Sequence, residues 1–334
     1  MTKISMPEYD IIVGLNEMEK IESHIKEVYA YDEVFIVTDE LVYSHYKAKI
    51  SDWFNAFKYQ VVLVPEGEKS KSFDIYLKAI EDLIKAGLKR QHLVIALGGG
   101  VIGDLTGFIA STIYRGVPFI QIPTTLLSMV DSSIGGKVGI DLEQGKNLIG
   151  SFYQPKKVII DPQFLNTLSV LEYRNGLAEM IKAGLIGNKE LFEFFLSHDQ
   201  VTEKEIIDAI EVKRQVVLID PYDYKERMYL NFGHSYGHAI EKKTKYSMYK
   251  HGQAISYGML IALEIGILEG ITRPCLYDEV KKVLLRLELV KQPLLEKEEF
   301  QDELKYDKKN MANGYHFVFI KDIGVPVIET IKIG

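Results

Sequence analysis

The sequence predicts an α/β fold: a parallel sheet wrapped by helices in the first half of the chain, followed by a mostly α-helical second half. Two observations lead to this prediction. Up to residue 161, short β-rich runs alternate with amphipathic segments, which is the pattern of a parallel sheet covered by helices. From residue 162 onward, apolar residues recur at helical spacing almost throughout. We therefore expect two domains, residues 1–161 and residues 162–334.

The strands expected in the first half are short runs rich in β-branched and aromatic residues, at residues 9–13, 34–38, 59–64, 93–97, 119–122 and 157–161. Helices are expected at residues 15–30, 72–86 and 101–114, where apolar residues share one face and charges the other. Gly87 ends the second of these helices. Nucleotides bind at the carboxyl ends of such strands, so the loops at residues 38–39, 66–71 and after residue 97 are candidates for ligand binding.

The second half is expected to contain helices at residues 171–185, 202–217, 252–269 and 275–287. Thr202 and Glu205 have the spacing of a capping box, which opens the second of these helices. Glu179 and Lys182 are three residues apart in the first and therefore share a face. After a polar turn at residues 307–309, residues 316–320 and 325–331 are expected to form a short β pair.

Composition narrows the class of protein. The chain has 334 residues, of which 47% are hydrophobic, so it can bury a large core. The formal charge of −7 argues against a surface that coats nucleic acid, although a basic pocket can lie within an acidic protein.

The single cysteine, Cys275, excludes an internal disulfide and a cysteine-based metal site, and we expect it to be buried. A cysteine count this low fits a reducing cytoplasm. No apolar run reaches the roughly 20 residues that span a bilayer, and the first ten residues lack the apolar core of a signal peptide. We therefore expect a soluble, unprocessed, cytoplasmic protein without membrane or nucleic-acid partners.

A glycine-rich turn follows the strand expected at residues 93–97, in the segment LGGGVIGDLTGF (97–108). Glycines there allow the backbone to approach a pyrophosphate closely, and the following helix presents its positive N-terminal end to the anion. The segment resembles the dinucleotide fingerprint of Rossmann-like domains without matching GxGxxG in register. Such a turn can also be only a tight connection, but its position on a predicted sheet favours nucleotide binding.

The next segment, residues 123–150, is too rich in Ser, Thr, Gly and Lys for ordinary core, and we expect a loop that contacts a ligand. Lys137 and Lys146 can meet a phosphate as point charges, and Asn147 adds a neutral donor. Loop lysines often serve only solubility. These two lie among glycines and apolar residues, where a charge without a role would be costly.

Three histidines lie close together in the stretch NFGHSYGHAIEKKTKYSMYKH (231–251). His234 and His238 are four apart in a segment that favours helix, so both imidazoles should project from one face, and His251 follows in the next loop. Histidine is the commonest neutral ligand for zinc-like metals, and a catalytic site needs three protein ligands with one position open. The alternative is that these residues cap or fill a helical bundle.

Taken together, eight motifs resemble the 3-dehydroquinate synthase family, in this order and spacing over nearly the whole chain: LGGGVIGDLTGF, YRG, PTTLL, VDSSIGGK, GKNLIG, NGLAEMIK, NFGHSYGHAIE and HGQA. The resemblance implies a lyase that converts 3-deoxy-D-arabino-heptulosonate 7-phosphate to 3-dehydroquinate and phosphate, in the shikimate route to aromatic amino acids. It also implies tightly held NAD, a divalent metal that is usually zinc and can be cobalt, and a homodimer.

The resemblance carries roles to individual residues. The metal ligands fall on Glu179, His234 and His251, so His238 becomes a neighbour that handles protons or binds substrate. NAD contacts are implied for Asp39, Glu66, Gly67, Glu68, Lys71, Gly99, Gly100, Val101, Ile102, Gly103, Asp104, Thr124, Thr125, Lys137, Lys146 and Thr167. The substrate phosphate is expected to meet Lys137, Asn147, Lys308 or Lys309, and Arg115 of a second subunit; the substrate carboxylate is expected to meet Lys213 and Arg227. The expected catalytic residues are Asp131, Lys146, Lys182, Asn231 and His238.

The implied chemistry accounts for both cofactors. Oxidation of the C5 hydroxyl by NAD creates a ketone that acidifies C6–H, so that phosphate can be eliminated. The hydride is then returned, the ring opens and an aldol reaction closes the carbocycle. The metal is expected to act as a Lewis acid at the C5 oxygen, and the leaving phosphate can serve as the base for its own departure.

The chain departs from the family pattern at Met129, Val138 and Gln253, where glutamine, threonine and glutamate are usual. We expect these changes to tune the pocket and leave the reaction type unchanged.

Three other functions fit parts of the pattern. Another sugar-phosphate cyclase, such as a 2-deoxy-scyllo-inosose synthase, has a substrate without the carboxylate, and the presence of Lys213, Arg227 and Asn231 argues against it. A metal-dependent polyol dehydrogenase has no need of phosphate-binding lysines. A non-catalytic NAD-binding protein should have lost a metal ligand or Lys146, and all are present.

Overall fold

The computed structural model describes residues 1–300, 302–304 and 315–331. The chain forms two compact units, Met1–Ser169 and Val170–Gly334. The boundary expected after residue 161 comes earlier in the chain than this one. The reason is a short 3-10 helix, η5 (Pro162–Thr167), whose Phe164 packs edge-on against Tyr46 and Trp53 of the first unit and so belongs with the sheet.

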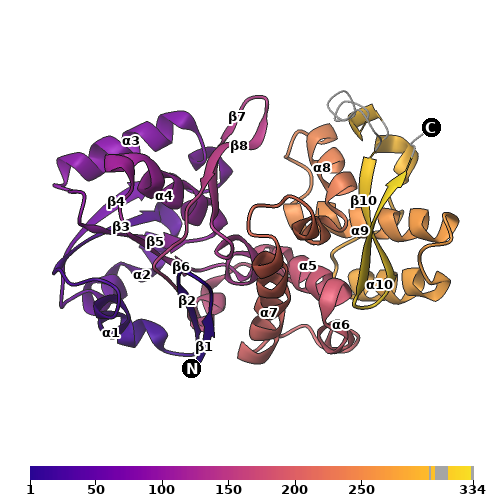
Figure 1. Cartoon of the computed structure of the whole chain (residues 1–334), viewed down its shortest axis with the longest axis horizontal. Helices are drawn as coiled ribbons and strands as arrows, with labels where there is room; N and C mark the ends of the chain where they lie inside the picture. Colours follow the sequence, from indigo (N-terminus) through magenta and orange to yellow (C-terminus); the bar gives the residue numbers. More distant parts are fainter. Residues whose placement is uncertain (301, 305–314, 332–334) are drawn as a thin grey trace. The chain divides into compact units, whose positions relative to one another are not determined.

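The first unit contains a seven-stranded sheet with the order β1-β2-β9-β6-β5-β3-β4 (Figure 1). The parallel strands are β2 (Asp10–Val13), β3 (Glu33–Asp39), β4 (Lys58–Val64), β5 (Leu93–Gly98), β6 (Phe119–Pro123) and β9 (Lys157–Ile160), and β1 (Thr2–Ser5) is antiparallel to β2. Every residue of β5, β6 and β9 is buried, as expected for strands covered on both faces. β9 comes last in the sequence but lies inside the sheet, between β2 and β6.

The helices of the first unit are α1 (Ile21–Lys26), α2 (Glu40–Trp53), α3 (Phe73–Lys85) and α4 (Gly100–Thr112), with shorter turns η1 (Glu17–Lys20), η2 (Glu68–Ser70) and η3 (Ile113–Arg115). The helix expected at residues 15–30 is therefore split and shorter. α2 is absent from the sequence prediction, because only Tyr46, Ile50 and Trp53 of its residues are buried. The core between α3, α4 and the sheet includes Leu83, Leu105 and Phe119, all fully buried.

Residues 123–150 are not the single loop expected from their composition. They contain a short π-helix, η4 (Ser128–Ser132), and most of a hairpin formed by β7 (Lys137–Leu142) and β8 (Gly145–Phe152). Gly139 and Gly150 face each other in this hairpin, and a Cβ on Gly150 would lie 2.3 Å from the carbonyl oxygen of Val138. Here the glycines allow close pairing of two strands, a use that composition alone does not reveal.

The second unit is mainly helical, so the predicted fold class, a Rossmann-like sheet domain followed by a helical domain, is confirmed. Its helices are α5 (Val170–Gly187), α6 (Lys189–Phe194), α7 (Glu203–Ile219), α8 (His234–Lys243), α9 (His251–Leu268) and α10 (Pro274–Arg286), with η6 (Glu226–Asn231), η7 (Lys297–Phe300) and the hairpin of β10 (Tyr315–Asp322) and β11 (Val325–Ile331). Within the described ranges, no helix has the length and apolar character needed to cross a bilayer.

Three local predictions in the second unit have clear outcomes. The capping box of α7 is present, with the N–H of Thr202 donating to Oε2 of Glu205 at 2.9 Å. His251 does not lie in a loop but is the first residue of α9. Cys275 is exposed, contrary to expectation, because it lies in the first turn of α10, where Nη1 of Arg273 is 2.7 Å from its sulfur.

Candidate active site

Glycine contacts bring α8 and α9 of the second unit together. Gly233, the N-cap of α8, has a φ of 79°, and a Cβ there would lie 2.8 Å from the carbonyl oxygen of Ile255 in α9. A Cβ on Gly258 of α9 would lie 2.0 Å from the carbonyl oxygen of Gly233. Only glycine permits this approach, so His234 at the start of α8 and His251 at the start of α9 come close together.

A second glycine contact joins α9 to α5. Gly252 donates its N–H to Oδ1 of Asn175 at 2.5 Å, and a Cβ on Gly252 would lie 2.5 Å from the carbonyl oxygen of Asn175. Glu179 follows Asn175 by one helical turn and therefore lies on the same face of α5. The contact places His251, the neighbour of Gly252, beside Glu179.

Glu179, His234 and His251 form a compact cluster. Oε1 of Glu179 lies 3.5 Å from Nε2 of His234 and 3.4 Å from Nε2 of His251. One potential ligand atom from each residue lies within 4.8 Å of the others. The structure thus brings together the three residues for which the resemblance implies metal binding.

The carboxylate of Glu179 is buried and ionised. Burial would raise its pKa, but the charges of Lys182, one turn later on α5, and of the two histidines outweigh burial and hold this pKa well below its usual range. Lys182 forms an ion pair with Oε2, yet neither oxygen of Glu179 has a hydrogen bond of good geometry from any described residue. A bound cation would satisfy a buried anion of this kind.

The two histidines present the same ring nitrogen to Glu179. Nδ1 of His234 lies 3.2 Å from the carbonyl oxygen of Phe232, which can only accept, so Nδ1 carries the proton and Nε2 keeps its lone pair. Burial, with the charge of Lys182, lowers the pKa of His234 well below its usual value, which favours the neutral, metal-binding ring. Burial also lowers the pKa of His251, but Glu179 and Glu241 outweigh it and raise that pKa to about 9.

This donor set fits a divalent metal, because a carboxylate and two imidazoles are usual ligands of zinc and cobalt. A second set, made of His238, Glu241 and His251, also has ligand atoms within 4.8 Å of one another. In that set, Glu241 faces Nδ1 of His251, and Glu179 would be left buried without the cation. The set that contains Glu179 is therefore the better metal site.

The other expected residues of the second unit lie on α5, η6, α7 and α8. Lys182, Lys213 and Arg227 are buried, although lysine and arginine are seldom so without a partner or a function. Asn231 and His238 are exposed, and the His238 ring lies edge-on to that of His234 at a centroid distance of 5.4 Å. Lys308 and Lys309 fall outside the described residues.

Asp220, which the sequence does not single out, shapes the turn that carries Arg227. Its Oδ2 accepts the N–H of Lys225 at 2.7 Å and that of Arg227 at 3.1 Å, and its Oδ1 accepts the N–H of Tyr224 at 3.0 Å. Burial acts to raise the pKa of Asp220, and these amide hydrogen bonds lower it to about 2. Nη1 of Arg227 donates to the carbonyl oxygen of Pro221 at 2.6 Å. Asp220 therefore holds the backbone of Arg227, and the carbonyl oxygen of Pro221 holds its guanidinium.

In the first unit, β5 leads into α4 through the glycine-rich turn. Gly99 is the N-cap of α4, and the first N–H groups of a helix have no partner within it, so this end of α4 can bind an anion. The glycines also allow tight packing: a Cβ on Gly98 would lie 2.6 Å from Cγ1 of Ile102, and one on Gly103 would lie 2.7 Å from Oε1 of Gln121. The close packing shows that the turn is a tight connection, and nucleotide binding at this turn stays a prediction.

A buried lysine links α4 to the hairpin. Lys71 donates to Oδ2 of Asp104 in α4 at 2.7 Å and also to Oδ1 of Asn147 in β8. Nearby, Nζ of Lys146 lies 3.5 Å from Oε1 of Glu68. Burial raises the pKa of Asp104, and the charge of Lys71 only partly offsets this. The structure brings five expected ligand-binding residues into two ion-paired groups.

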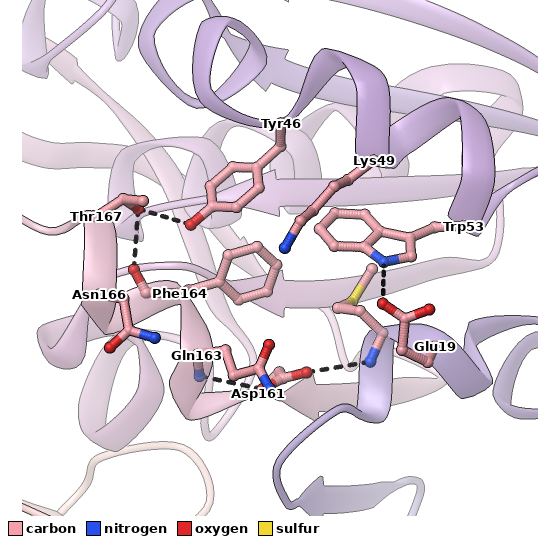
Figure 2. Close-up of a pocket in the computed structure, with 10 residues that line it drawn as sticks. Glu19, Tyr46, Lys49, Trp53, Asp161, Gln163, Phe164, Asn166 and Thr167 are labelled. Atoms are coloured by element: carbon pink, nitrogen blue, oxygen red, sulfur yellow. Dashed lines mark hydrogen bonds between the residues drawn. The ribbon is translucent and has the colours of Figure 1, made fainter.

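Thr167 lines a small cavity of about 120 Å³ in the first unit (Figure 2). Its Oγ1 lies 2.6 Å from the hydroxyl oxygen of Tyr46, and Nε1 of Trp53 donates to Oε1 of Glu19 at 3.2 Å. The volume is below the roughly 300 Å³ of common ligand pockets. The cavity would therefore accept only part of a larger ligand.

The remaining expected residues of the first unit have varied surroundings. Asp39 caps α2, accepting the N–H of Val42 at 2.8 Å, and burial raises its pKa. Thr124 donates its N–H to the carbonyl oxygen of Gly98 at 2.9 Å. Thr125 and Asp131 are half-buried, and Glu66, Gly67, Arg115 and Lys137 are exposed.

The three departures from the family pattern occupy structural positions. Met129 is fully buried in η4, and Val138 lies where a Cβ on Gly107 of α4 would come within 2.4 Å of its Cγ1. Oε1 of Gln253 accepts the N–H of Lys250 at 3.1 Å and so caps α9 next to His251. None of the three is among the expected ligands.

Comparison with known proteins agrees with the geometry. The N-terminal model of 3-dehydroquinate synthase matches residues 61–175, and the C-terminal model matches residues 176–310. The chain is 41% identical over 334 residues to the 3-dehydroquinate synthase of Clostridium botulinum (strain Alaska E43 / Type E3), covering 97% of this chain and 95% of that protein.

Two of the solved structures that share the fold are sugar cyclases with bound NAD+ and metal. One is a 2-deoxy-scyllo-inosose synthase complexed with carbaglucose-6-phosphate, NAD+ and Co2+, with a TM-score of 0.88, 24% identity, and coverage of 99% of this chain and 97% of that one. The other is ValA, a 2-epi-5-epi-valiolone synthase from Streptomyces hygroscopicus subsp. jinggangensis 5008 with NAD+ and Zn2+ bound, with a TM-score of 0.88, 24% identity, and coverage of 100% and 95%. At this identity the likeness shows the fold alone. The two family models together span most of the chain, and the chain therefore belongs to the 3-dehydroquinate synthase family.

Proposed function

We propose that the chain converts 3-deoxy-D-arabino-heptulosonate 7-phosphate to 3-dehydroquinate and inorganic phosphate, as an NAD- and metal-dependent carbon–oxygen lyase. One observation supports this most directly: in a member of this family, His234 and His251 lie beside the buried, ionised carboxylate of Glu179.

In this proposal, Glu179, His234 and His251 hold a divalent metal, Zn2+ in preference to Co2+. The metal would supply a Lewis acid for the hydroxyl oxygen of the alcohol that NAD oxidises. Lys182 keeps Glu179 anionic and adds positive potential at the site, where an anionic substrate would bind. His238, exposed beside His234, is suited to move a proton between substrate and solvent.

The first unit holds NAD in this proposal, and NAD supplies a reversible hydride acceptor. The N-terminal end of α4 would bind its pyrophosphate. Lys71 is already paired with Asp104, so its role is to position hydrogen-bonding groups rather than to add net charge. Thr167 and the cavity of Figure 2 would contact a further part of the cofactor.

The substrate carries a carboxylate and a phosphate, and we assign a different group of residues to bind each of them. Lys213 and Arg227 would bind the carboxylate, since the guanidinium can make two parallel hydrogen bonds to it. Lys137 and Asn147 would bind the phosphate, with Lys308 or Lys309 and with Arg115 of the partner subunit in a homodimer. Lys146, Asp131 and Asn231 complete the proposed catalytic set.

The rival is a sugar-phosphate cyclase that acts on a substrate without a carboxylate. The shared fold does not separate the two, because 2-deoxy-scyllo-inosose synthase superposes with a TM-score of 0.88. Lys213 and Arg227 are buried cations, and both can bind a carboxylate that the substrate of the rival does not carry.

The test is a phosphate-release assay on the heptulosonate phosphate and on glucose 6-phosphate, each with and without a metal chelator. We expect release from the heptulosonate phosphate alone, loss of release with the chelator, and recovery with added Zn2+ or Co2+. Turnover of glucose 6-phosphate at a comparable rate would assign the chain to the rival function. Release that persists after the metal has been removed and the removal verified would contradict the metal assignment.

We also propose a homodimer that works in the cytoplasm, as expected for this family. Sedimentation velocity tests the first point, and activity of the Arg115→Ala variant tests whether that residue serves the site. A monomer with full activity would exclude a contribution from a partner subunit.

A further inference from the structure

Glu241 is a buried carboxylate for which the proposed mechanism has no role. It lies on α8, three residues after His238 and seven after His234, and is 2% exposed. Helical spacing places it on the same face as His234. Its Oε1 lies 3.5 Å from Nδ1 of His251, the first residue of α9.

The ring of His251 lies between two carboxylates, and each faces a different nitrogen. Nε2 is 3.4 Å from Oε1 of Glu179, and Nδ1 is 3.5 Å from Oε1 of Glu241. A neutral imidazole carries one proton, and a metal binds the nitrogen without it. An ionised carboxylate only accepts hydrogen bonds, so Glu241 favours the proton on Nδ1. This tautomer leaves the lone pair of Nε2 directed towards Glu179.

His234 has the same arrangement with a different acceptor. Its Nδ1 faces the carbonyl oxygen of Phe232 at 3.2 Å, and its Nε2 faces Glu179 at 3.5 Å. Each histidine of the cluster therefore has an acceptor at Nδ1 that leaves Nε2 for a metal. The acceptor for His234 belongs to the backbone and cannot be removed by substitution, whereas the acceptor for His251 is a side chain.

We propose that Glu241 is a positioning residue for the metal site: it accepts the Nδ1–H of His251 and thereby sets the tautomer and orientation in which His251 binds metal through Nε2. A carboxylate behind a histidine ligand also increases the basicity of that ligand. The inference rests on the metal site of the proposed function and extends it to a residue outside the ligand set.

The experiment compares Glu241→Ala and Glu241→Gln with wild type and with Glu264→Gln. Glu264 lies on α9 about 20 Å along the helix from His251, and its partly exposed carboxylate pairs with Lys297, so its substitution controls for loss of one negative charge. Zn2+ dissociation constants are measured by competition with a chelator, the visible spectrum is recorded with Co2+, and thermal unfolding is followed for the metal-free proteins.

We expect Glu241→Ala to weaken Zn2+ binding roughly 10- to 100-fold, the usual effect of removing such a partner. Glu241→Gln should weaken it less, because the amide oxygen still accepts from Nδ1–H. The Co2+ spectrum should change in Glu241→Ala and stay unchanged in Glu264→Gln. Metal-free Glu241→Gln should unfold at the same temperature as metal-free wild type.

Wild-type Zn2+ affinity in both Glu241 variants would overturn the inference, as would a loss of affinity in Glu241→Gln that is matched by a loss of metal-free stability. The isosteric Glu241→Gln keeps the test valid if Glu241→Ala does not fold. The two failures are distinguishable: a wild-type protein that binds neither Zn2+ nor Co2+ would remove the proposed function itself, whereas normal wild-type binding with unaffected variants removes only the role of Glu241.

Discussion

Each unit of the molecule contains a buried lysine paired with a carboxylate, and the pKa values of the two carboxylates are shifted in opposite directions. In the first unit, burial raises the pKa of Asp104 even though Nζ of Lys71 lies 2.7 Å from its Oδ2. In the second unit, the pKa of Glu179 is held well below its usual range despite burial.

The difference comes from the remaining neighbours. Asp104 also faces the negative charges of Glu68 and Asp131, which act against its ionisation. Glu179 faces Lys182 and two histidines, all of which favour ionisation. One lysine therefore does not decide the direction in which the pKa of a carboxylate shifts; the sum of its neighbours does. The ionised carboxylate of Glu179 can therefore bind a cation, whereas the carboxylate of Asp104 chiefly positions Lys71.

The largest expected effect comes from removing the charge of Glu179. Glu179→Gln should lose bound metal and lower the rate of phosphate release at least about 10³-fold, because a Lewis acid contributes several kcal/mol to the transition state and 1.36 kcal/mol is tenfold in rate. Metal content and phosphate release of the purified variant are the measurements.

The matched control for Glu179→Gln is Glu193→Gln on α6, where the exposed carboxylate pairs with Lys189 at 3.5 Å. This variant should keep both metal and rate. Wild-type metal content and wild-type phosphate release in Glu179→Gln would show that Glu179 does not hold a metal. The difference in pKa between Glu179 and Asp104 would then have no bearing on function.

A smaller effect should separate substrate from nucleotide. Arg227→Ala should raise the KM for the sugar phosphate roughly 10- to 100-fold, since a hydrogen bond to a charged group contributes about 1.5–3 kcal/mol. NAD affinity should not change, because the nucleotide is assigned to the first unit. Steady-state kinetics and NAD titration test this. Arg214→Ala on α7, whose guanidinium pairs with Glu211, is the control, and unchanged kinetics in Arg227→Ala would refute the assignment.

The first unit is tested by Lys71→Met, which keeps the side-chain length and removes the charge. Asp104 and Asn147 lose their shared donor, so NAD affinity should fall about tenfold, the lower end of the range for a charged hydrogen bond. Isothermal titration of NAD measures the effect. Lys69→Met, at an exposed position two residues earlier, should bind NAD normally. Equal affinities in the two variants would remove Lys71 from the nucleotide site.

The smallest effect concerns Asp220, a carboxylate held by backbone amides and not by a lysine. Its pKa of about 2 in the folded chain lies below the ordinary value of 3.8, so its contribution to stability is present above pH 3.8 and is lost as the pH falls towards 2. Asp220→Asn should therefore be less stable than wild type near neutral pH, and the difference should narrow through this acidic range. Urea unfolding at a series of pH values measures it, and a pH-independent difference would show that amide hydrogen bonds do not set this pKa.

Much of the local structure follows from residue types near one another in the chain. The capping box of Thr202 and Glu205, and the shared face of Glu179 and Lys182, both appear as expected. Local pattern misleads where glycine serves close packing: Gly139 and Gly150 pair two strands in a segment whose composition suggests a loop.

The candidate site shows the same division. The spacing of His234 and His238 correctly places both on one helix, but spacing alone would group these two with His251. The resemblance to the family replaces His238 by Glu179, and the structure brings Glu179 beside His234 and His251. The role of Glu241 could have been suspected from the sequence, because Glu241 follows both α8 histidines at helical spacing. The role of Asp220 could not, because its partners are backbone amides, which every residue except proline carries.

The sequence by itself determined the types of most elements, the order of the two units and the set of charged residues available for chemistry, but it did not reveal α2 or the hairpin of β7 and β8. The tertiary structure alone decided which of these residues meet. Glu179 is 55 residues before His234 in the chain, and no local pattern relates them. They meet because Gly233, Gly252 and Gly258 let α8, α9 and α5 approach to distances that any Cβ would prevent. This contact depends on the packing of three helices at once, and the spacing of residues along the chain carries no information about that packing.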